Sequence, residues 1–291
     1  MASQPRIERL TRLNFTGCRA RTSARQLSIR PAKTNPWRAI IHTPVEVGAL
    51  NLVSQSEVGQ RHEPWHRDVL DDLEQRLSDP GFPCIFSRNA YKKKLVKFIF
   101  VDRLDDDGIQ YLADGLQRYV ELSRAWDGRI DTAYPLIVAF SLTAVQAGTV
   151  AEYQAHGWRI LQALHDVDPM PWPEGIDVSP DSTNWSMCFD GMPLFCNMSN
   201  AAHVERPSRN LGRHFILVIN PRERFDIVAG DTPRGRKSRA NIRQRIDKYD
   251  AIPHSDQLGS YGEGALEWQQ YGLADDNSQS IPECPFKFNG Q

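Results

Sequence analysis

Apolar residues recur at helical spacing in three long segments of the chain. The first segment runs from Pro64 to Asp79, with apolar residues at four-residue steps behind a proline that suits a first helical turn. The second, residues 106–124, opens with carboxylates, which favour the positive end of a helix dipole. The third, residues 150–164, runs into a stretch with four prolines between 169 and 180. The pattern predicts three amphipathic helices, the last followed by an extended loop.

Short apolar runs between these helices predict strands. FPCIF (82–86) is expected to be a short buried strand, joined by NAYKKK to a second strand in LVKFIFVDRL (95–104), so that the two form a hairpin. PLIVAFSL (135–142) predicts a core strand or a buried helical turn, and HFILVINP (214–221) predicts a strand. WRAIIHTPVEV (37–47) could add one edge strand.

The segment WSMCFDGMPLFCNMS (185–199) carries a hairpin signal. Asp190 and Gly191 both accept the positive φ that a two-residue turn requires, which pairs Phe189 with Met192. Side chains alternate along each strand, so one face of this hairpin is predicted to be entirely apolar. Its members are Trp185, Met187, Phe189, Met192, Leu194, Cys196 and Met198, with Cys188 on the opposite face.

The rest of the chain completes an α+β prediction. TPRGRKSRANIRQRIDKYD (232–250) is expected to be a helix with Ile242 and Ile246 on its packed side, and residues 255–291 a long ordered loop. Hairpins separated by helices favour a single domain with a mixed β-sheet flanked by helices. We assign this domain to residues 61–291 and a loosely held basic extension to residues 1–60.

The composition of the chain limits the classes of protein to which it can belong. The chain has 291 residues, 40% hydrophobic and 24% charged, with a net charge of −1, as in ordinary globular proteins. Residues 1–33 hold seven arginines and Lys33 against Glu8, which suits an organellar transit peptide or a basic extension. The longest apolar stretch, Pro135 to Val145, is too short to span a membrane. Five cysteines without close pairs argue against a disulfide framework and predict a cytoplasmic protein.

The motifs of two common kinds of site, phosphate-binding loops and structural zinc sites, are absent from the sequence. The chain has no glycine-rich phosphate loop, and the spacing of Cys188, Cys196 and His203 does not fit a structural zinc site. His203 follows a strand and could be a metal ligand or simply a hydrogen-bonded turn residue. Cys196, like Cys84, Cys188 and Cys284, could be a thiolate ligand or ordinary core packing; their positions alone leave both open.

Cationic residues cluster in two places. Arg206 and Arg209 follow His203 and suit a carboxylate, although a solvated surface would explain them equally. The arginines of residues 234–245 could meet phosphates, but aromatic residues are not interleaved with them, so a solvated helix face is the simpler interpretation and nucleic-acid binding is not favoured.

An ordered series of motifs resembles the YqcI/YcgG family. The motifs include FPCIFSRNAYKKKLVKFIFVD, LHDVDPMPWPEG, WSMCFDGMPLFCNMSNAAHVERPSRNLG, INPRERFD and EWQQYGLADDN, and with CPF they extend over residues 62–288. The resemblance implies a heme-dependent monooxygenase that hydroxylates a guanidine nitrogen of L-arginine, or of a related compound, in antibiotic biosynthesis. A protonated guanidinium is a poor nucleophile, so oxidising it requires an activated oxygen species of the kind heme iron provides.

The resemblance also implies roles for individual residues. His203 would be the axial ligand of heme b (iron protoporphyrin IX), with Cys196 as second choice, and Arg206 and Arg209 would bind a propionate or the substrate carboxylate. Three further residues would contact the guanidinium: Asp190 or Glu205 as its acidic partner and Trp185 as a stacking ring. The oxidant would be peroxide, or dioxygen with an external electron donor. The alternatives are a non-catalytic heme sensor or carrier and, less favoured, a nucleic-acid-binding protein.

Overall fold

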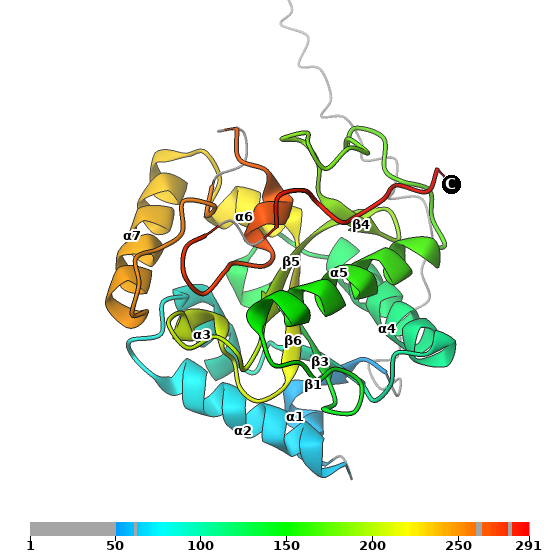
Figure 1. Cartoon of the computed structure of the whole chain (residues 1–291), viewed down its shortest axis with the longest axis horizontal. Coiled ribbons are helices and arrows are strands. Elements are labelled where there is room, and N and C mark those ends of the chain that lie inside the picture. Colours follow the sequence, from blue (N-terminus) through cyan, green and yellow to red (C-terminus); the bar gives the residue numbers. More distant parts are fainter. Residues whose placement is uncertain (1–50, 61–62, 260–263, 279–280, 291) are drawn as a thin grey trace, which may run out of the picture. The chain divides into compact units, whose positions relative to one another are not determined.

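A computed structural model describes residues 51–60, 63–259, 264–278 and 281–290. They contain a six-stranded sheet in the order β1-β2-β3-β6-β5-β4, in which β2 and β3 are parallel and the other neighbours antiparallel (Figure 1). The strands are β1 (Val53–Ser54), β2 (Lys97–Val101), β3 (Leu136–Phe140), β4 (Met187–Phe189), β5 (Met192–Ser199) and β6 (Phe215–Pro221). The mixed sheet of the α+β prediction is therefore confirmed.

Helices pack against both faces of this sheet. The α-helices of the described residues are α1 (Gln55–Val58), α2 (Pro64–Ser78), α3 (Ile85–Lys92), α4 (Asp106–Arg124), α5 (Val150–Asp166), α6 (Arg222–Val228) and α7 (Pro233–Tyr249). Alternate residues of β2 belong to different cores: Ile99 packs with residues of α4 and α5, and Phe98 with residues of α2. The alternation of side chains along buried strands thus separates two apolar layers.

Most predicted elements are confirmed. The three amphipathic helices correspond to α2, α4 and α5, the basic helix is α7, and residues 136–140 form a core strand rather than a helical turn. Asp190 (φ 49°) and Gly191 (φ 70°) make the expected turn, with Phe189 paired to Met192. The apolar face predicted for this hairpin packs in the core beside α4 and α5. Because every signal for this hairpin is local, the sequence was sufficient to define it.

The predicted hairpin of residues 82–104 is wrong. Residues 85–92 form α3, whose N-cap is Cys84: its sulfur accepts the Ser87 N–H at 3.4 Å. Ala90 and Tyr91 are the buried residues of α3, and the Tyr91 hydroxyl donates to the Leu70 carbonyl in α2 at 3.2 Å. A short apolar run does not distinguish a strand from a helix start, and here the capping residue and the charged residues after it belong to one helix.

The folded part begins before residue 61. Val53 and Ser54 form β1, which pairs with β2, and Val58 in α1 is fully buried. The predicted edge strand at 37–47 and most of the predicted extension lie outside the described residues. Among the helices of the described part, none has the length and apolar character needed to cross a membrane.

Candidate functional site

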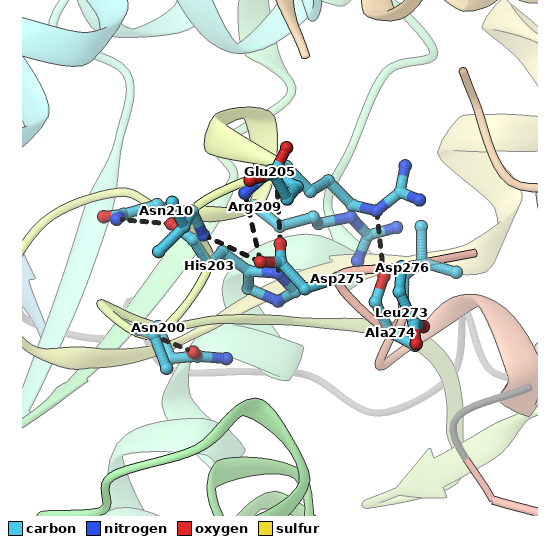
Figure 2. A network of polar contacts seen from close by, with 12 residues as sticks. Asn200, His203, Glu205, Arg209, Asn210, Leu273, Ala274, Asp275 and Asp276 are labelled. Atoms are coloured by element: carbon cyan, nitrogen blue, oxygen red, sulfur yellow. Dashed lines mark hydrogen bonds and ion pairs between the residues drawn. The ribbon is translucent and has the colours of Figure 1, made fainter. Parts of the chain in front are cut away.

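A polar network joins the loop after β5 to the C-terminal segment. The loop runs from Asn200 to β6 and carries His203, Arg206 and Arg209, the main cofactor ligands predicted from sequence. Figure 2 shows Asp275 of the segment 264–278 beside His203, with Arg209 and Ala274 close by. The structure thus brings three of the predicted residues together, against a segment of the same chain for which the sequence predicts no role.

Asp275 lies at the centre of this network. Its Oδ1 accepts hydrogen bonds from His203 Nδ1 and from the Arg206 N–H, and its Oδ2 accepts from the N–H groups of Val204 and Glu205, all at 3.0 Å. Burial alone would raise the pKa of Asp275, but the hydrogen bonds from Glu205, Val204 and His203 outweigh burial and lower it. An ionised carboxylate therefore fixes the loop backbone and the imidazole together.

His203 is a neutral, enclosed imidazole. Its side chain is 1% exposed, and burial lowers its pKa to about 4, opposed in part by the hydrogen bond to Asp275. With Asp275 as acceptor, the ring proton belongs on Nδ1 and the lone pair on Nε2. This is the protonation state that a metal ligand needs, and a carboxylate on the other ring nitrogen is the usual orienting partner of such a ligand.

Arg206 and Arg209 are buried rather than solvated. Arg206 donates from Nε to the Ala274 carbonyl at 3.1 Å and from Nη2 to Asn277 Oδ1, and its Nη1 lies 3.7 Å from Asp250 Oδ2 without a hydrogen bond. Arg209 donates to the carbonyls of Gln270 and Tyr271 at 3.0 and 3.2 Å. Most guanidinium donors of this pair therefore hold the C-terminal segment in place.

The charges around these arginines are balanced. Burial lowers the pKa of Arg209 to about 9, with Arg206 adding to the effect, so Arg209 remains charged at neutral pH. Asp250 accepts from the Ser208 N–H and hydroxyl at 2.8 and 2.7 Å, while burial raises its pKa. The nearby carboxylates stabilise the cations in an environment where an unpaired charge would be costly.

An open depression adjoins the network. Its volume is about 400 Å³, within the range of small-molecule sites. Asn277 belongs to both features, since its Oδ1 accepts from Arg206 while its side chain lines the depression. Gln257 Oε1 is buried there without a hydrogen bond. The lining residues are His254, Ser255, Asp256, Gln257, Gln269 and Asn277, which offer hydrogen-bonding groups to a polar ligand.

The predicted contacts to the guanidinium do not gather at this network. Asp190 occupies the hairpin turn and pairs with Arg124 at 3.0 Å; the eight residues of β5 separate it from the loop by roughly 25 Å of extended chain. Trp185 is fully buried in the apolar core. Glu205 is in the loop but exposed, and its N–H donates to Asp275.

Three of the four cysteines in the described residues are buried: Cys188, Cys196 and Cys284. Burial raises the pKa of Cys188, Cys196 and Cys284, so each is a protonated thiol at neutral pH. Cys196 lies inside the apolar core, as its place in the hairpin predicted, and Cys84 caps α3. Within the described ranges, no group of three or more His, Cys, Asp and Glu side chains is arranged to hold a metal ion.

Several arginines of α7 are also committed to internal contacts. Arg243 donates to the Leu258 carbonyl, and Arg245 donates to the carbonyls of Pro80, Phe82 and Pro83. These contacts dock the helix against neighbouring loops. The strongly basic sequence of α7 is therefore explained in part by intramolecular packing.

Sequence reasoning missed the residues that complete the site. Asp275 and Asn277 belong to the motif EWQQYGLADDN, but no local pattern indicates that they meet a loop about 70 residues earlier. Asp250 was assigned only to a helix end. Their short polar side chains are common in loops, and only the tertiary contact distinguishes them.

Comparisons with known proteins give the family. Residues 73–287 match the model of the YqcI/YcgG family. "Putative N(omega)-hydroxy-L-arginine synthase DcsA" of Streptomyces lavendulae is 62% identical over 239 residues, which cover 82% of this chain and 90% of that protein. "Uncharacterized protein YqcI" of Bacillus subtilis (strain 168) is 33% identical over 229 residues, covering 76% and 87%. "Uncharacterized protein YcgG" of the same organism is 34% identical over 232 residues, covering 77% and 88%.

No solved structure matches the chain. The family model extends over most of the sequence, and the relatives align along most of their own length. The resemblance inferred from the motifs is confirmed: the chain belongs to the YqcI/YcgG family.

Proposed function

We propose that this protein is a heme-dependent monooxygenase that hydroxylates a guanidine nitrogen of L-arginine or a closely related compound. The observation that carries the proposal is the 62% identity to DcsA over 90% of that protein, whose name specifies N(omega)-hydroxy-L-arginine synthesis. Identity at this level along nearly the whole relative supports a shared substrate class. Heme is the cofactor implied by the family resemblance.

The described histidines offer imidazoles of the kind that bind heme iron. His203 and His254 each have Nδ1 next to a carboxylate, Asp275 at 3.0 Å and Asp247 at 2.7 Å, an arrangement that orients an imidazole ligand. Burial raises the pKa of the Cys196 thiol, so its thiolate would form only on binding the iron, whereas an imidazole ligates in its neutral form. When bound, heme supplies the activated oxygen species, derived from peroxide or from dioxygen and an external electron donor.

The chain's own residues would bind and orient the substrate. A guanidinium is a cation with five N–H donors, so a site for it needs acceptors. The depression offers the Asp256 carboxylate and the unpaired Gln257 Oε1. A substrate carboxylate would require a cation; Arg206 lies behind Asn277, to which its Nη2 donates, but its side chain is only 1% exposed and its Nη1 faces Asp250. Holding both ends of an amino acid would place one nitrogen for oxidation.

Product analysis tests the activity. The purified heme-loaded protein is incubated with L-arginine and either hydrogen peroxide or a reductant with dioxygen, and products are analysed by mass spectrometry. We expect arginine to gain one oxygen atom on a guanidine nitrogen, and L-lysine, which lacks the guanidine group, to remain unchanged. Heme-loaded protein that oxidises neither arginine nor other guanidine compounds under both regimes would contradict the proposal.

A further inference from the structure

The depression beside Asn277 is suited to a small polar ligand. Its volume is about 400 Å³, and all the residues that line it carry polar side chains: His254, Ser255, Asp256, Gln257, Gln269 and Asn277. An iron porphyrin needs apolar walls and more room, and an apolar ligand would gain little by leaving water for such a surface. The lining offers hydrogen bonds instead, so we expect a small ligand with many polar groups.

Two walls of the depression are fixed by hydrogen bonds to other residues. The backbone N–H and Nδ1 of His254 both donate to Asp247 Oδ1, each at 2.7 Å, and these hydrogen bonds lower the pKa of Asp247. Asn277 accepts from Arg206 Nη2 with its Oδ1 and donates from its Nδ2 to the Pro253 carbonyl at 2.9 Å. Both side chains are thus held in place before a ligand binds, which reduces the entropy lost on binding.

Three lining residues present hydrogen-bond acceptors. Because Nδ1 of His254 donates to Asp247, the lone pair of the neutral ring is on Nε2. Gln257 Oε1 is buried without a hydrogen-bond partner among the described residues, whereas buried polar atoms are normally paired. Asp256 is exposed and adds a carboxylate, which only accepts. This set of acceptors fits a ligand that donates hydrogen bonds.

The charges at the depression favour a cation over an anion. The described lining carries the Asp256 carboxylate and neither a lysine nor an arginine. Arg206 lies behind Asn277, its side chain is 1% exposed, and its Nη1 faces Asp250 Oδ2 at 3.7 Å. This guanidinium is therefore committed to protein groups and does not offer itself to the carboxylate of an amino acid. A guanidinium ligand matches the lining, because it is a cation with five N–H donors and no acceptor.

We propose that the depression is the subsite for the guanidinium end of the substrate. The Asp256 carboxylate provides the opposite charge, and Gln257 Oε1 and His254 Nε2 accept N–H groups. This assignment rests on the proposed function, which names guanidine compounds as the substrate class. It also widens that class: because the described lining offers no cation to a carboxylate, the site accepts agmatine, which is L-arginine without its carboxylate, as readily as L-arginine.

Calorimetric titration of the purified full chain with four compounds tests which group is recognised. They are L-arginine, agmatine, L-lysine, which lacks the guanidine group, and L-citrulline, in which a neutral urea replaces the guanidinium. We expect the dissociation constants of arginine and agmatine to agree within about fivefold, and those of lysine and citrulline to be at least about tenfold higher, since both lack the charged, planar set of donors. A difference between arginine and agmatine above about fivefold, or citrulline binding as tightly as arginine, would overturn the assignment.

Single substitutions test where the guanidinium binds. Asp256→Asn removes the charge, and Gln257→Met and His254→Phe each remove an acceptor while keeping a side chain of similar size. We expect each variant to bind agmatine about tenfold more weakly or worse, the usual effect of losing a hydrogen bond to a charged group. Because Asp256 is exposed, Asp256→Asn tests the subsite even if the other two variants fail to fold.

Asp276→Asn is the matched control. It removes another exposed carboxylate, next to Asn277, that accepts from the Ser278 N–H and is not among the residues lining the depression. We expect it to change the dissociation constant of agmatine by less than about twofold, because exposed charges outside the site are screened. A loss equal to that of Asp256→Asn would show that the overall charge of this region, rather than the subsite, determines binding.

The outcomes separate this assignment from the proposed function. If Asp256→Asn and Gln257→Met bind agmatine as tightly as the wild type does, the subsite is wrong, while oxidation of arginine would still establish the proposed function. If the wild type binds neither arginine nor agmatine, the subsite is also wrong, and product analysis alone decides the function. If the variants lose binding but heme-loaded wild type oxidises no guanidine compound, the proposed function fails and the binding site stands.

Discussion

The two ends of β5 are built by different kinds of contact. At its start, the turn of Asp190 and Gly191 depends on two adjacent residues that accept positive φ. Beyond its end, the loop with His203 and Arg206 is held by Asp275 and Asn277, about 70 residues further along the chain. A hairpin can therefore be predicted from the local sequence, whereas a polar site formed by segments distant in the sequence cannot.

The buried ionisable groups at the two ends also respond oppositely to burial. Beyond the end of β5, burial lowers the pKa of His203 to about 4. At the turn, burial raises the pKa of Asp168 to about 6, although this carboxylate accepts the Asp190 N–H at 2.9 Å. In both cases burial favours the neutral form, so the two groups should give stability opposite dependences on pH.

The largest effect is expected from Arg206→Met. The substitution removes the cation 3.7 Å from Asp250, leaving only the more distant charge of Arg209 near that carboxylate among the described residues, and it removes the donors to Ala274 and Asn277. We expect the free energy of unfolding to fall by about 4 kcal/mol, as measured by urea denaturation. The control Arg103→Met removes a guanidinium that is 61% exposed and should cost less than about 1 kcal/mol. Equal effects of the two variants would show that the Arg206 network is not stabilising.

Asp275→Ala should come next. It removes the acceptor of three backbone N–H groups and of His203. We expect a loss of about 3 kcal/mol, measured in the same way, because the part-buried donors of His203 and Arg206 would be left unsatisfied. Asp276→Ala is the matched control, since that neighbouring carboxylate is exposed and accepts from the Ser278 N–H within its own turn, and its loss should cost about 0.5 kcal/mol or less. A loss below about 1 kcal/mol in Asp275→Ala would contradict the central role of this carboxylate.

The pH dependence of stability provides a test at the loop that carries His203. The folded pKa of His203, about 4, lies below its ordinary value of 6.5, so the unfolded chain binds more protons between these values. Wild-type stability should therefore fall, relative to His203→Gln, as pH drops from 6.5 to 4, by on the order of 2 kcal/mol. A constant difference between the two proteins across this range would refute the shift.

At the turn of Asp190 and Gly191, stability should depend on pH in the opposite direction. The folded pKa of Asp168, about 6, lies above its ordinary value of 3.8, so the folded protein binds more protons between these values. Relative to Asp168→Asn, the wild type should lose on the order of 2 kcal/mol as pH rises from 3.8 to 6. Urea denaturation at several pH values measures both variants, and slopes of the same sign would overturn the contrast between the two ends.

The smallest effect is expected from Asp190→Asn. Asparagine also accepts the positive φ of the turn, and Arg124, the charged partner of Asp190, is partly solvated. We expect a change below about 1 kcal/mol in the free energy of unfolding. A much larger loss would show that this end of β5 also depends on a buried charge network.

How much of the fold could be predicted from the sequence also depends on whether the signal is local. Helix α4 was predicted with its observed bounds, because its acidic first turn and apolar stripe lie within one segment. Helix α3 was mistaken for a strand because its short apolar run allowed both structures and the capping role of Cys84 was not recognised. The local pattern of apolar residues was sufficient to predict these elements, except where an apolar run was too short to distinguish a helical period from that of a strand.

Only part of the candidate site could be predicted from the sequence. His203, Arg206 and Arg209 were correctly grouped because they lie within one motif. Their partners come from residues 250–277, where no local pattern signals binding. Contacts across long sequence separations, rather than residue types, define this site.

The most direct test of the account is the visible absorption spectrum of the freshly purified wild-type protein. It is recorded oxidised and then reduced with carbon monoxide, with and without L-arginine. The account predicts a Soret band that changes when arginine is added and a carbon monoxide complex typical of imidazole rather than thiolate ligation. Protein that shows no heme absorbance after expression with ample heme, or a heme spectrum that arginine leaves unchanged, would contradict the proposed function.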